Sequence, residues 1–211
     1  MTASFLVLDL ETANAAFSSV CQYGLVTVGP KGITDRRSAL IDPRSHFTST
    51  RIHGIARRHV RGCPPFQHVY PELRKRLSGQ IVVAHSTFER KALAASVKEF
   101  KLPAIDCTWV DSIRVAQDAW SELAGEGHGL RRLADYLRIP LTQHDALSDA
   151  VATAEIVILA MEKTGLPITH WVGKGARKFR GPGSSVRLSK AFPGWTPPAP
   201  DEGGEIGRAH V

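Results

Sequence analysis

A buried strand that ends in two acidic side chains constrains this chain more than any other feature. Residues 5–12 read Phe-Leu-Val-Leu-Asp-Leu-Glu-Thr, so an apolar run typical of a core strand leads directly into Asp9 and Glu11. Because successive side chains alternate between the faces of a strand, both carboxylates lie on the same face. Buried carboxylates repel each other unless a cation lies between them, and hard divalent metals prefer such oxygen ligands. Taken alone, the pattern also fits an acidic turn at the end of a core strand.

The rest of the chain predicts an α/β fold. Short links between the first three strands favour an antiparallel meander, with a turn at 29–32. The predicted strands span 5–12, 20–28, 33–41, 81–84 and 105–110. Helices are predicted from Pro64-Pro65 to Leu77, from the segment 85–89 to about Phe100, after Asp111 as N-cap, from Gly129-Leu130, and from about Ala146 to Lys163.

Two further acids occupy notable positions on the predicted helices. Glu89 shares a helical stripe with the apolar residues at positions i+3, i+4 and i+11, so its carboxylate is expected to point toward the sheet. Asp149 lies in the first turn of the last helix, and His144 precedes it on a short loop. A histidine and an acid at this spacing also fit a helix-capping cluster, so this pair alone does not establish a site.

Together these segments resemble the DEDDh family of 3′–5′ exonucleases, and most of all its proofreading members in bacterial DNA polymerase III and their free-standing relatives. The resemblance covers roughly residues 4–164. The segments that match are 9–12 (Asp-Leu-Glu-Thr), 83–89 (Val-Ala-His-Ser-Thr-Phe-Glu) and 144–150 (His-Asp-Ala-Leu-Ser-Asp-Ala), with further matches at 52–55 and 127–130.

The resemblance implies a fold for the whole matching region. It implies an α/β, ribonuclease H-like fold of three α/β/α layers, with a mixed five-stranded sheet of order 3-2-1-4-5. One position departs from the family pattern, because the second motif normally ends in Asp and this chain has Glu89. The charge and the face of the helix are kept, but the extra methylene shifts the carboxylate oxygens. The swap is expected to be tolerated, since the family's acid at this position holds its metal largely through water.

The resemblance also implies a mechanism. Two cations, Mg²⁺ or Mn²⁺, would be held by Asp9, Glu11, Glu89 and Asp149, and His144 would take a proton from the attacking water. The terminal nucleotide would be held by the backbone around Leu10 and Thr12. Three side chains would also hold it: His53, His85 and Phe88. From the residues alone, His53 also fits a structural role and Phe88 also fits the core.

The charge of the chain favours an anionic partner. The formal net charge is +7, and nucleic acid is preferred to membrane because there is no basic amphipathic helix or lipidation motif. No apolar run reaches the roughly 20 residues of a membrane span, and no signal peptide is recognised, so a cytoplasmic location is expected. The separated Cys21, Cys63 and Cys107 suggest neither disulfides nor a zinc site, and we expect them to be small core residues.

Several functional alternatives remain open at this stage. The expected function is release of nucleoside monophosphates from 3′ ends, with single-stranded DNA favoured as the substrate. The alternatives are a binding module of the same fold for nucleic-acid ends, with activity weakened by Glu89, and an exoribonuclease. Association with a DNA polymerase is also open. Nucleoside-triphosphate hydrolysis and dinucleotide chemistry are not indicated, since the glycine-rich phosphate-binding motifs are absent from the sequence.

The composition predicts a domain boundary near residue 168. We expect an exonuclease domain over 1–168, a basic Gly/Pro-rich flexible tail over 169–204, and a non-native sequence artefact over 205–211. Aromatic residues lie among the basic residues of this tail, so they are candidates for stacking on bases: Trp171, Phe179, Phe192 and Trp195.

Overall fold

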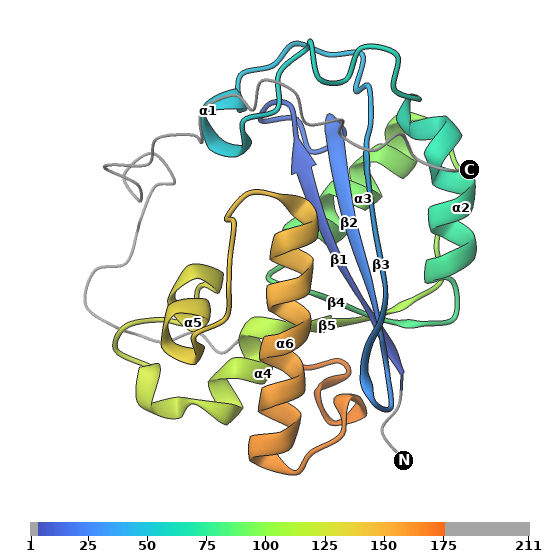
Figure 1. Ribbon diagram of the computed structural model, residues 1–211. Coiled ribbons are helices and arrows are strands. Elements are labelled where there is room, and N and C mark those ends of the chain that lie inside the picture. The colour runs from blue at the N-terminus through green and yellow to red at the C-terminus, as the bar shows by residue number, and fades with distance from the viewer. Residues whose placement is uncertain (1–3, 176–211) are drawn as a thin grey trace.

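A mixed five-stranded sheet lies at the centre of this computed structural model, which describes residues 4–175 (Figure 1). The strands are β1 (Phe5–Thr12), β2 (Val20–Gly29), β3 (Gly32–Leu40), β4 (Ile81–Ala84) and β5 (Thr108–Asp111). Their order is β3-β2-β1-β4-β5, as predicted. The pairs β1–β2 and β2–β3 are antiparallel, whereas β1–β4 and β4–β5 are parallel.

Helices cover both faces of this sheet. They are α1 (Thr50–His53), α2 (Phe66–Leu77), α3 (Phe88–Glu99), α4 (Ser112–Ala119), α5 (Leu130–Leu137) and α6 (Ala146–Thr164), with 3₁₀ turns at Ser121–Leu123 and Ile168–Trp171. Helices α2 and α3 lie on one face, and α4, α5 and α6 on the other (Figure 1). The predicted three-layer, ribonuclease H-like architecture is confirmed. Within the described residues, no helix is long and apolar enough to cross a membrane.

The alternation of side chains along β1 produces two hydrophobic cores. Leu6, Leu8 and Leu10 pack in the core beneath α2 and α3. Phe5 and Val7 pack in the other core, which includes residues of α4 and α6. By the same alternation, the side chains of residues 9 and 11 lie on the α6 face of the sheet. The apolar half of β1 therefore anchors the strand, and its last residues present acids to α6.

The fifth strand is shorter than predicted. It begins at Thr108 rather than at residue 105, and it includes Asp111. Its four residues pair one to one with the four residues of β4, so the length of β4 limits the length of β5. The side chain of Asp111 accepts a hydrogen bond of 2.9 Å from the Ile113 N–H, which confirms its predicted role as the N-cap of α4.

Two expectations about side chains need correction. Trp171, assigned to the basic tail, is fully buried in the α4/α6 core, and its Nε1–H donates to Asp118 Oδ2 at 3.0 Å. It therefore belongs to the folded domain and is not available to stack on bases. The other three aromatic residues of the tail lie outside the described residues. Of the three free cysteines, Cys21 is buried as expected, but Cys63 and Cys107 are half-buried.

Candidate active site

The paired strands β1 and β2 place the first two acids next to the start of α6. On the α6 face, the β2 partners of Phe5 and Val7 are both valine, whereas Asp9 lies opposite Gly24 and Glu11 lies opposite Gln22. A Cβ atom on Gly24 would overlap the Ala146 carbonyl of α6. The glycine therefore lets the first turn of α6 approach the sheet closely, next to the two acids.

The third acid of the site comes from that first turn of α6. Asp149 is 5% exposed, and its Oδ2 accepts a 3.0 Å hydrogen bond from the backbone N–H of His144. His144 has a φ of 65°, a left-handed conformation that turns the loop back toward the helix. Its Nδ1 lies 3.8 Å from Glu11 Oε1. One ligand atom from each of Glu11, His144 and Asp149 lies within 4.8 Å of the other two.

Hydrogen bonds from the Gln22 side chain hold the start of α6 against β2. The side chain of Gln22 donates to Asp145 Oδ2 at 3.2 Å, and its Oε1 accepts from the Ala146 N–H, also at 3.2 Å. Asp145 is the N-cap of the helix and accepts from the Ser148 N–H at 2.8 Å. Sequence analysis did not identify Gln22 or Gly24. The available signal was a glycine inside a strand, which often marks a close approach of backbone.

The fourth acid, Glu89, is buried in the first turn of α3. It is 4% exposed, as its inward position on the helical stripe predicts. Burial, followed by the charges of Glu11, Asp111 and Asp149, raises the pKa of Glu89 to about 8. Among the described residues, no hydrogen-bond partner is found for its buried Oε2. A buried carboxylate oxygen of this kind needs a cation or a proton.

The four acids act on one another electrostatically. Burial raises the pKa of Asp9 well above its usual range, and the nearby charges of Glu89, Asp149 and Glu11 raise it further. Burial also raises the pKa of Asp149 to about 7, and its buried Oδ1 has no hydrogen-bond partner among the described residues. Clustered carboxylates with orphaned oxygens fit hard divalent cations. The donor set at this site therefore suits Mg²⁺ or Mn²⁺.

The residues predicted to hold the terminal nucleotide differ in which of their groups are available for contact. Leu10 has its side chain in the α2/α3 core, so only its backbone is available. His53 Nε2 lies 3.1 Å from the Thr12 carbonyl, and its Nδ1 accepts from the Ile55 N–H at 3.1 Å. Burial lowers the pKa of His53 below its ordinary value. His53 thus fixes the backbone just beyond Glu11, and both of its ring nitrogens are engaged within the protein.

His85 directly follows β4, and Phe88 is the first residue of α3. His85 Nδ1 lies 2.8 Å from Ser112 Oγ, and burial lowers its pKa to about 4, so the imidazole is neutral at physiological pH. Phe88 is half-buried, and its ring centroid lies 5.4 Å from that of Phe17, which is 39% exposed. Phe88 therefore lies between core and surface, with an aromatic neighbour that the sequence analysis missed.

A family model described as exonuclease (RNase_T) matches residues 6–157. The chain belongs to the exonuclease family. This membership confirms the predicted resemblance and, at the level of the family, the predicted enzyme class.

Curated relatives place this domain within longer proteins. The chain is 27% identical over 169 residues to a PolC-type DNA polymerase III of Caldanaerobacter subterraneus, covering 77% of this chain and 12% of that protein. It is 29% identical over 175 residues to the PolC-type enzyme of Streptococcus thermophilus, covering 78% of this chain and 12% of that protein. The chain thus spans about an eighth of the length of these relatives.

Solved structures share the fold. An exonuclease X in complex with 5′-overhanging duplex DNA superposes with a TM-score of 0.64 at 20% identity, covering 79% of this chain and 96% of that chain. E. coli exonuclease I in complex with a dT13 oligonucleotide superposes with a TM-score of 0.64 at 15% identity, covering 77% and 42%. These likenesses establish the shared architecture.

Proposed function

We propose that this protein is a 3′–5′ exonuclease that hydrolyses terminal phosphodiester bonds of nucleic acid, DNA in particular, and releases nucleoside monophosphates. The observation that carries the proposal is the grouping of Glu11, His144 and Asp149 within 4.8 Å of one another. It is supported by the orphaned buried oxygens of Glu89 and Asp149, and by the raised pKa of Asp9, on which the charges of all three other acids act after burial. Membership of the exonuclease family supports the same assignment.

The four acids would hold two divalent cations, Mg²⁺ or Mn²⁺. Asp9 would be shared between them, Glu11 and Asp149 would complete one coordination shell, and Glu89 would hold the second through water. When bound, such cations supply charge neutralisation at the phosphate and a water that is acidic enough to attack at neutral pH. Burial and then mutual repulsion raise the pKa values of Asp9, Glu89 and Asp149, and the charge of the cations would offset both effects.

His144 is the proposed general base. Its imidazole is half-buried, and the neighbouring Glu11 carboxylate raises its pKa above the ordinary value. The left-handed backbone at this residue and the hydrogen bond from its N–H to Asp149 hold the ring beside the acids. In the neutral form, His144 accepts a proton from the attacking water as the phosphodiester bond is cleaved.

The terminal nucleotide would lie against the end of β1. The backbone at Leu10 and Thr12 would contact its sugar, with His53 and His85 on either side and Phe88 against the base. The partners proposed are therefore 3′ ends of single-stranded DNA. Association with a DNA polymerase is a further proposal, supported by the names of the relatives and testable by co-purification.

Digestion of labelled strands tests this function. Single-stranded DNA, duplex DNA and RNA of matched sequence, labelled at the 5′ end, are incubated with Mg²⁺ or Mn²⁺ and with excess chelator. We expect a ladder that shortens from the 3′ end, fastest on DNA, and no cleavage in chelator. Asp149→Asn should lower the rate by at least about 100-fold, because it removes a charge worth several kcal/mol at the transition state.

An exposed acid provides the control for this experiment. Asp135→Asn, on the outer surface of α5, removes the same charge away from the site and should keep full activity. Binding of 3′ ends without any metal-dependent cleavage would instead favour the binding module. Faster degradation of RNA would assign an exoribonuclease.

A further inference from the structure

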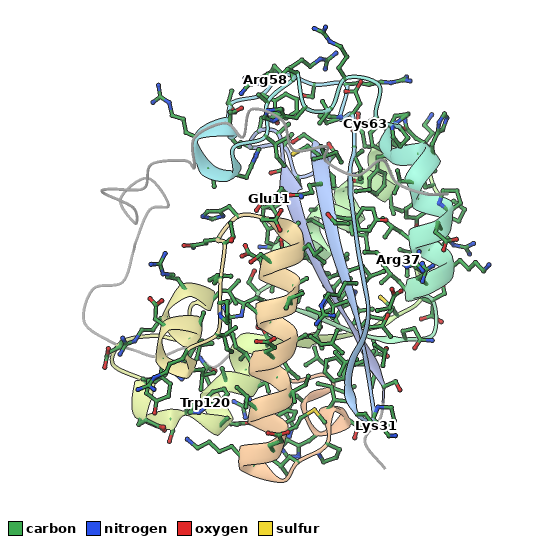
Figure 2. All side chains as sticks on the ribbon, viewed as in Figure 1. Glu11, Lys31, Arg37, Arg58, Cys63 and Trp120 are labelled. Atoms are coloured by element: carbon green, nitrogen blue, oxygen red, sulfur yellow. The ribbon has the colours of Figure 1, made fainter. Side chains whose placement is uncertain are left out.

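A surface of exposed arginines lies on the segment between β3 and α2. The sequence contains no acid between Asp42 and Glu72. The same stretch contains exposed arginines, which we call the arginine face: Arg44, Arg51, Arg57, Arg58 and Arg61. Figure 2 shows Arg58 at the same end of the sheet as Glu11, whereas Lys31 lies at the opposite end. The segment that carries the arginine face, which includes α1, lies at the end of the sheet where β1 ends (Figure 1).

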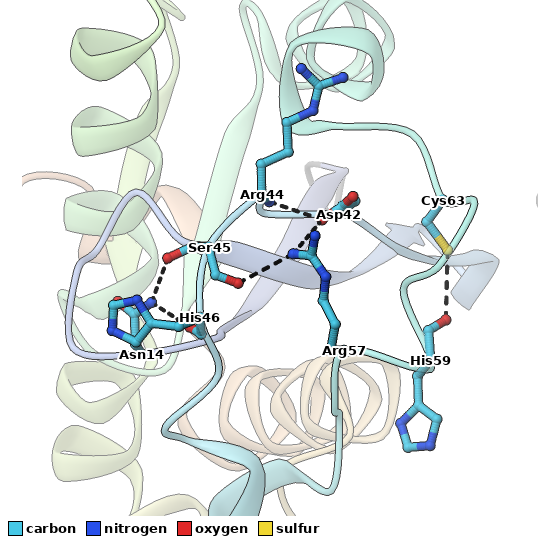
Figure 3. A network of polar contacts seen from close by, with 8 residues as sticks. All are labelled: Asn14, Asp42, Arg44, Ser45, His46, Arg57, His59 and Cys63. Carbon is cyan, nitrogen blue, oxygen red and sulfur yellow. Dashed lines mark hydrogen bonds and ion pairs between the residues drawn. The ribbon is translucent and has the colours of Figure 1, made fainter.

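This segment is fastened to the chain just beyond Glu11. The Ala13 carbonyl accepts a 3.0 Å hydrogen bond from the Ser49 N–H. The side chain of Asn14 donates to Ser45 Oγ and to the His46 carbonyl, each at 2.8 Å (Figure 3). With the contact of His53 to Thr12, these bonds tie the arginine segment to three consecutive residues that follow the acids of β1. The arginines are thus held in a fixed place relative to the site.

Most of the arginine face is not neutralised within the protein. Arg57 makes the internal contacts, with Nη1 lying 3.5 Å from Asp42 Oδ1 and 3.4 Å from the Ser45 carbonyl (Figure 3). Within residues 4–175, none of the other four arginines forms an ion pair. Guanidinium groups match the geometry of phosphate oxygens and form paired hydrogen bonds with them. Unopposed guanidinium groups at one end of the molecule thus suit a polyanion with repeated phosphates.

We infer that the arginine face binds the sugar–phosphate backbone of the strand being digested, on the 5′ side of the scissile bond. The inference rests on the proposed function, since it uses the position of the 3′ end. A 3′ terminus that contacts the backbone at Thr12 would lie against the residues to which the arginine segment is hydrogen-bonded. The strand whose 3′ end occupies the site is therefore the polyanion that lies nearest to the arginine face. Its role is to retain long strands between successive cleavages.

Two triple variants with equal changes in charge test the inference. Arg51→Gln/Arg58→Gln/Arg61→Gln removes three charges from the arginine face and leaves Arg57 and its structural contacts in place. Lys31→Gln/Arg36→Gln/Lys98→Gln removes three exposed charges elsewhere on the surface. Binding is measured without added metal, by fluorescence anisotropy of an oligothymidylate of about 24 nucleotides, longer than a typical single-strand site.

The salt dependence of binding gives the expected magnitude. Each phosphate contact on a single strand contributes about 0.7 to the slope of log affinity against log salt, so losing three contacts lowers the slope by about 2. Between about 50 and about 200 mM salt, wild type should lose roughly 20-fold more affinity than the arginine variant. The surface control should keep the wild-type slope.

Short and long substrates separate the inference from the proposed function. All three proteins should hydrolyse the p-nitrophenyl ester of thymidine 5′-monophosphate equally, because this substrate reaches only the acids. Only the arginine variant should lose its preference for the long strand in kcat/KM. If wild type cleaves the ester but the two variants share one salt slope, the inference is wrong and the proposed function stands. If wild type binds the long strand with the expected slope and cleaves nothing, the proposed function fails while the binding surface stands.

Binding to a duplex shows whether the phosphates on the arginine face come from the digested strand or from its complement. The same oligonucleotide is annealed to a complement that leaves a 5′ overhang. A loss of affinity in the arginine variant that appears on this duplex and not on the single strand would place the complementary strand on the face and overturn the assignment.

Discussion

Glu89→Gln should stabilise the metal-free protein at alkaline pH. The pKa of Glu89 is raised to about 8 from an ordinary 4.5, so the folded state binds its proton more tightly than the unfolded state. The free energy of unfolding therefore falls as pH rises from about 4.5 to about 8. The shift of the Glu89 pKa from 4.5 to about 8 corresponds to a loss of at most about 5 kcal/mol in the free energy of unfolding. Because the neighbouring acids take up part of the same proton binding, we expect a loss of about 2 kcal/mol from Glu89.

The amide keeps the shape of the side chain and removes the charge. In chelator, wild type and Glu89→Gln should have similar stability near pH 5, and the variant should be more stable by about 2 kcal/mol near pH 8. Added Mn²⁺ should reverse this order, because only the carboxylate gains from the cation. Urea denaturation at several pH values, with chelator and with Mn²⁺, measures both effects. Glu162→Gln, which changes an exposed carboxylate of α6, is the matched control.

A pH profile that is the same for wild type and Glu89→Gln in chelator would refute this reasoning. It would mean that the Glu89 carboxylate is stabilised without help from a cation. An equal gain from Mn²⁺ in both proteins would lead to the same conclusion.

Two other predictions test the base and the approach of α6. Because only the neutral imidazole can accept a proton from water, wild-type kcat in saturating metal should rise with pH as His144 loses its proton, and His144→Ala should lower kcat and flatten that rise while affinity for a single strand is kept; an unchanged profile would assign the base elsewhere. Gly24→Ala should destabilise the protein by about 1 to 3 kcal/mol and reduce activity, since its Cβ would overlap the Ala146 carbonyl, whereas Gly125→Ala, where a Cβ meets nothing within 4 Å, should do neither; thermal unfolding and the cleavage assay measure both.

The sequence predicted the elements that local pattern controls. The β1 strand, the inward position of Glu89 and the Asp111 cap follow from period, helical stripe and capping chemistry, and the structure confirms them. The sheet order came from the family resemblance, because pairing between distant strands leaves no local signal. Trp171 was misassigned because a run of basic residues and glycines follows it, while the core that buries it comes from α4 and α6.

The supporting residues of the site were not predictable from local pattern. Gln22 of β2 hydrogen-bonds to the start of α6, which is more than a hundred positions away in the sequence. The left-handed backbone of His144 depends on the same helix start, which supplies Asp149 as an acceptor. Such contacts exist only once β2 and α6 meet, so a single sequence indicates the acids but not the side chains that position them.

The electrostatics of the site bear on the one departure from the family pattern. Among the neighbouring charges, Glu89 raises the pKa of Asp9 more than Asp149 or Glu11 does. Burial is the largest cause of the raised pKa of both Asp9 and Glu89. Glu11, His144 and Asp149 gather separately within 4.8 Å of one another. The charges of Glu89, Asp149 and Glu11 all act on Asp9, and divalent cations held by these acids would offset that repulsion. Glu89 is buried in the first turn of α3, and its Oε2 has no hydrogen-bond partner among the described residues, so the longer acid keeps an oxygen available for the proposed role.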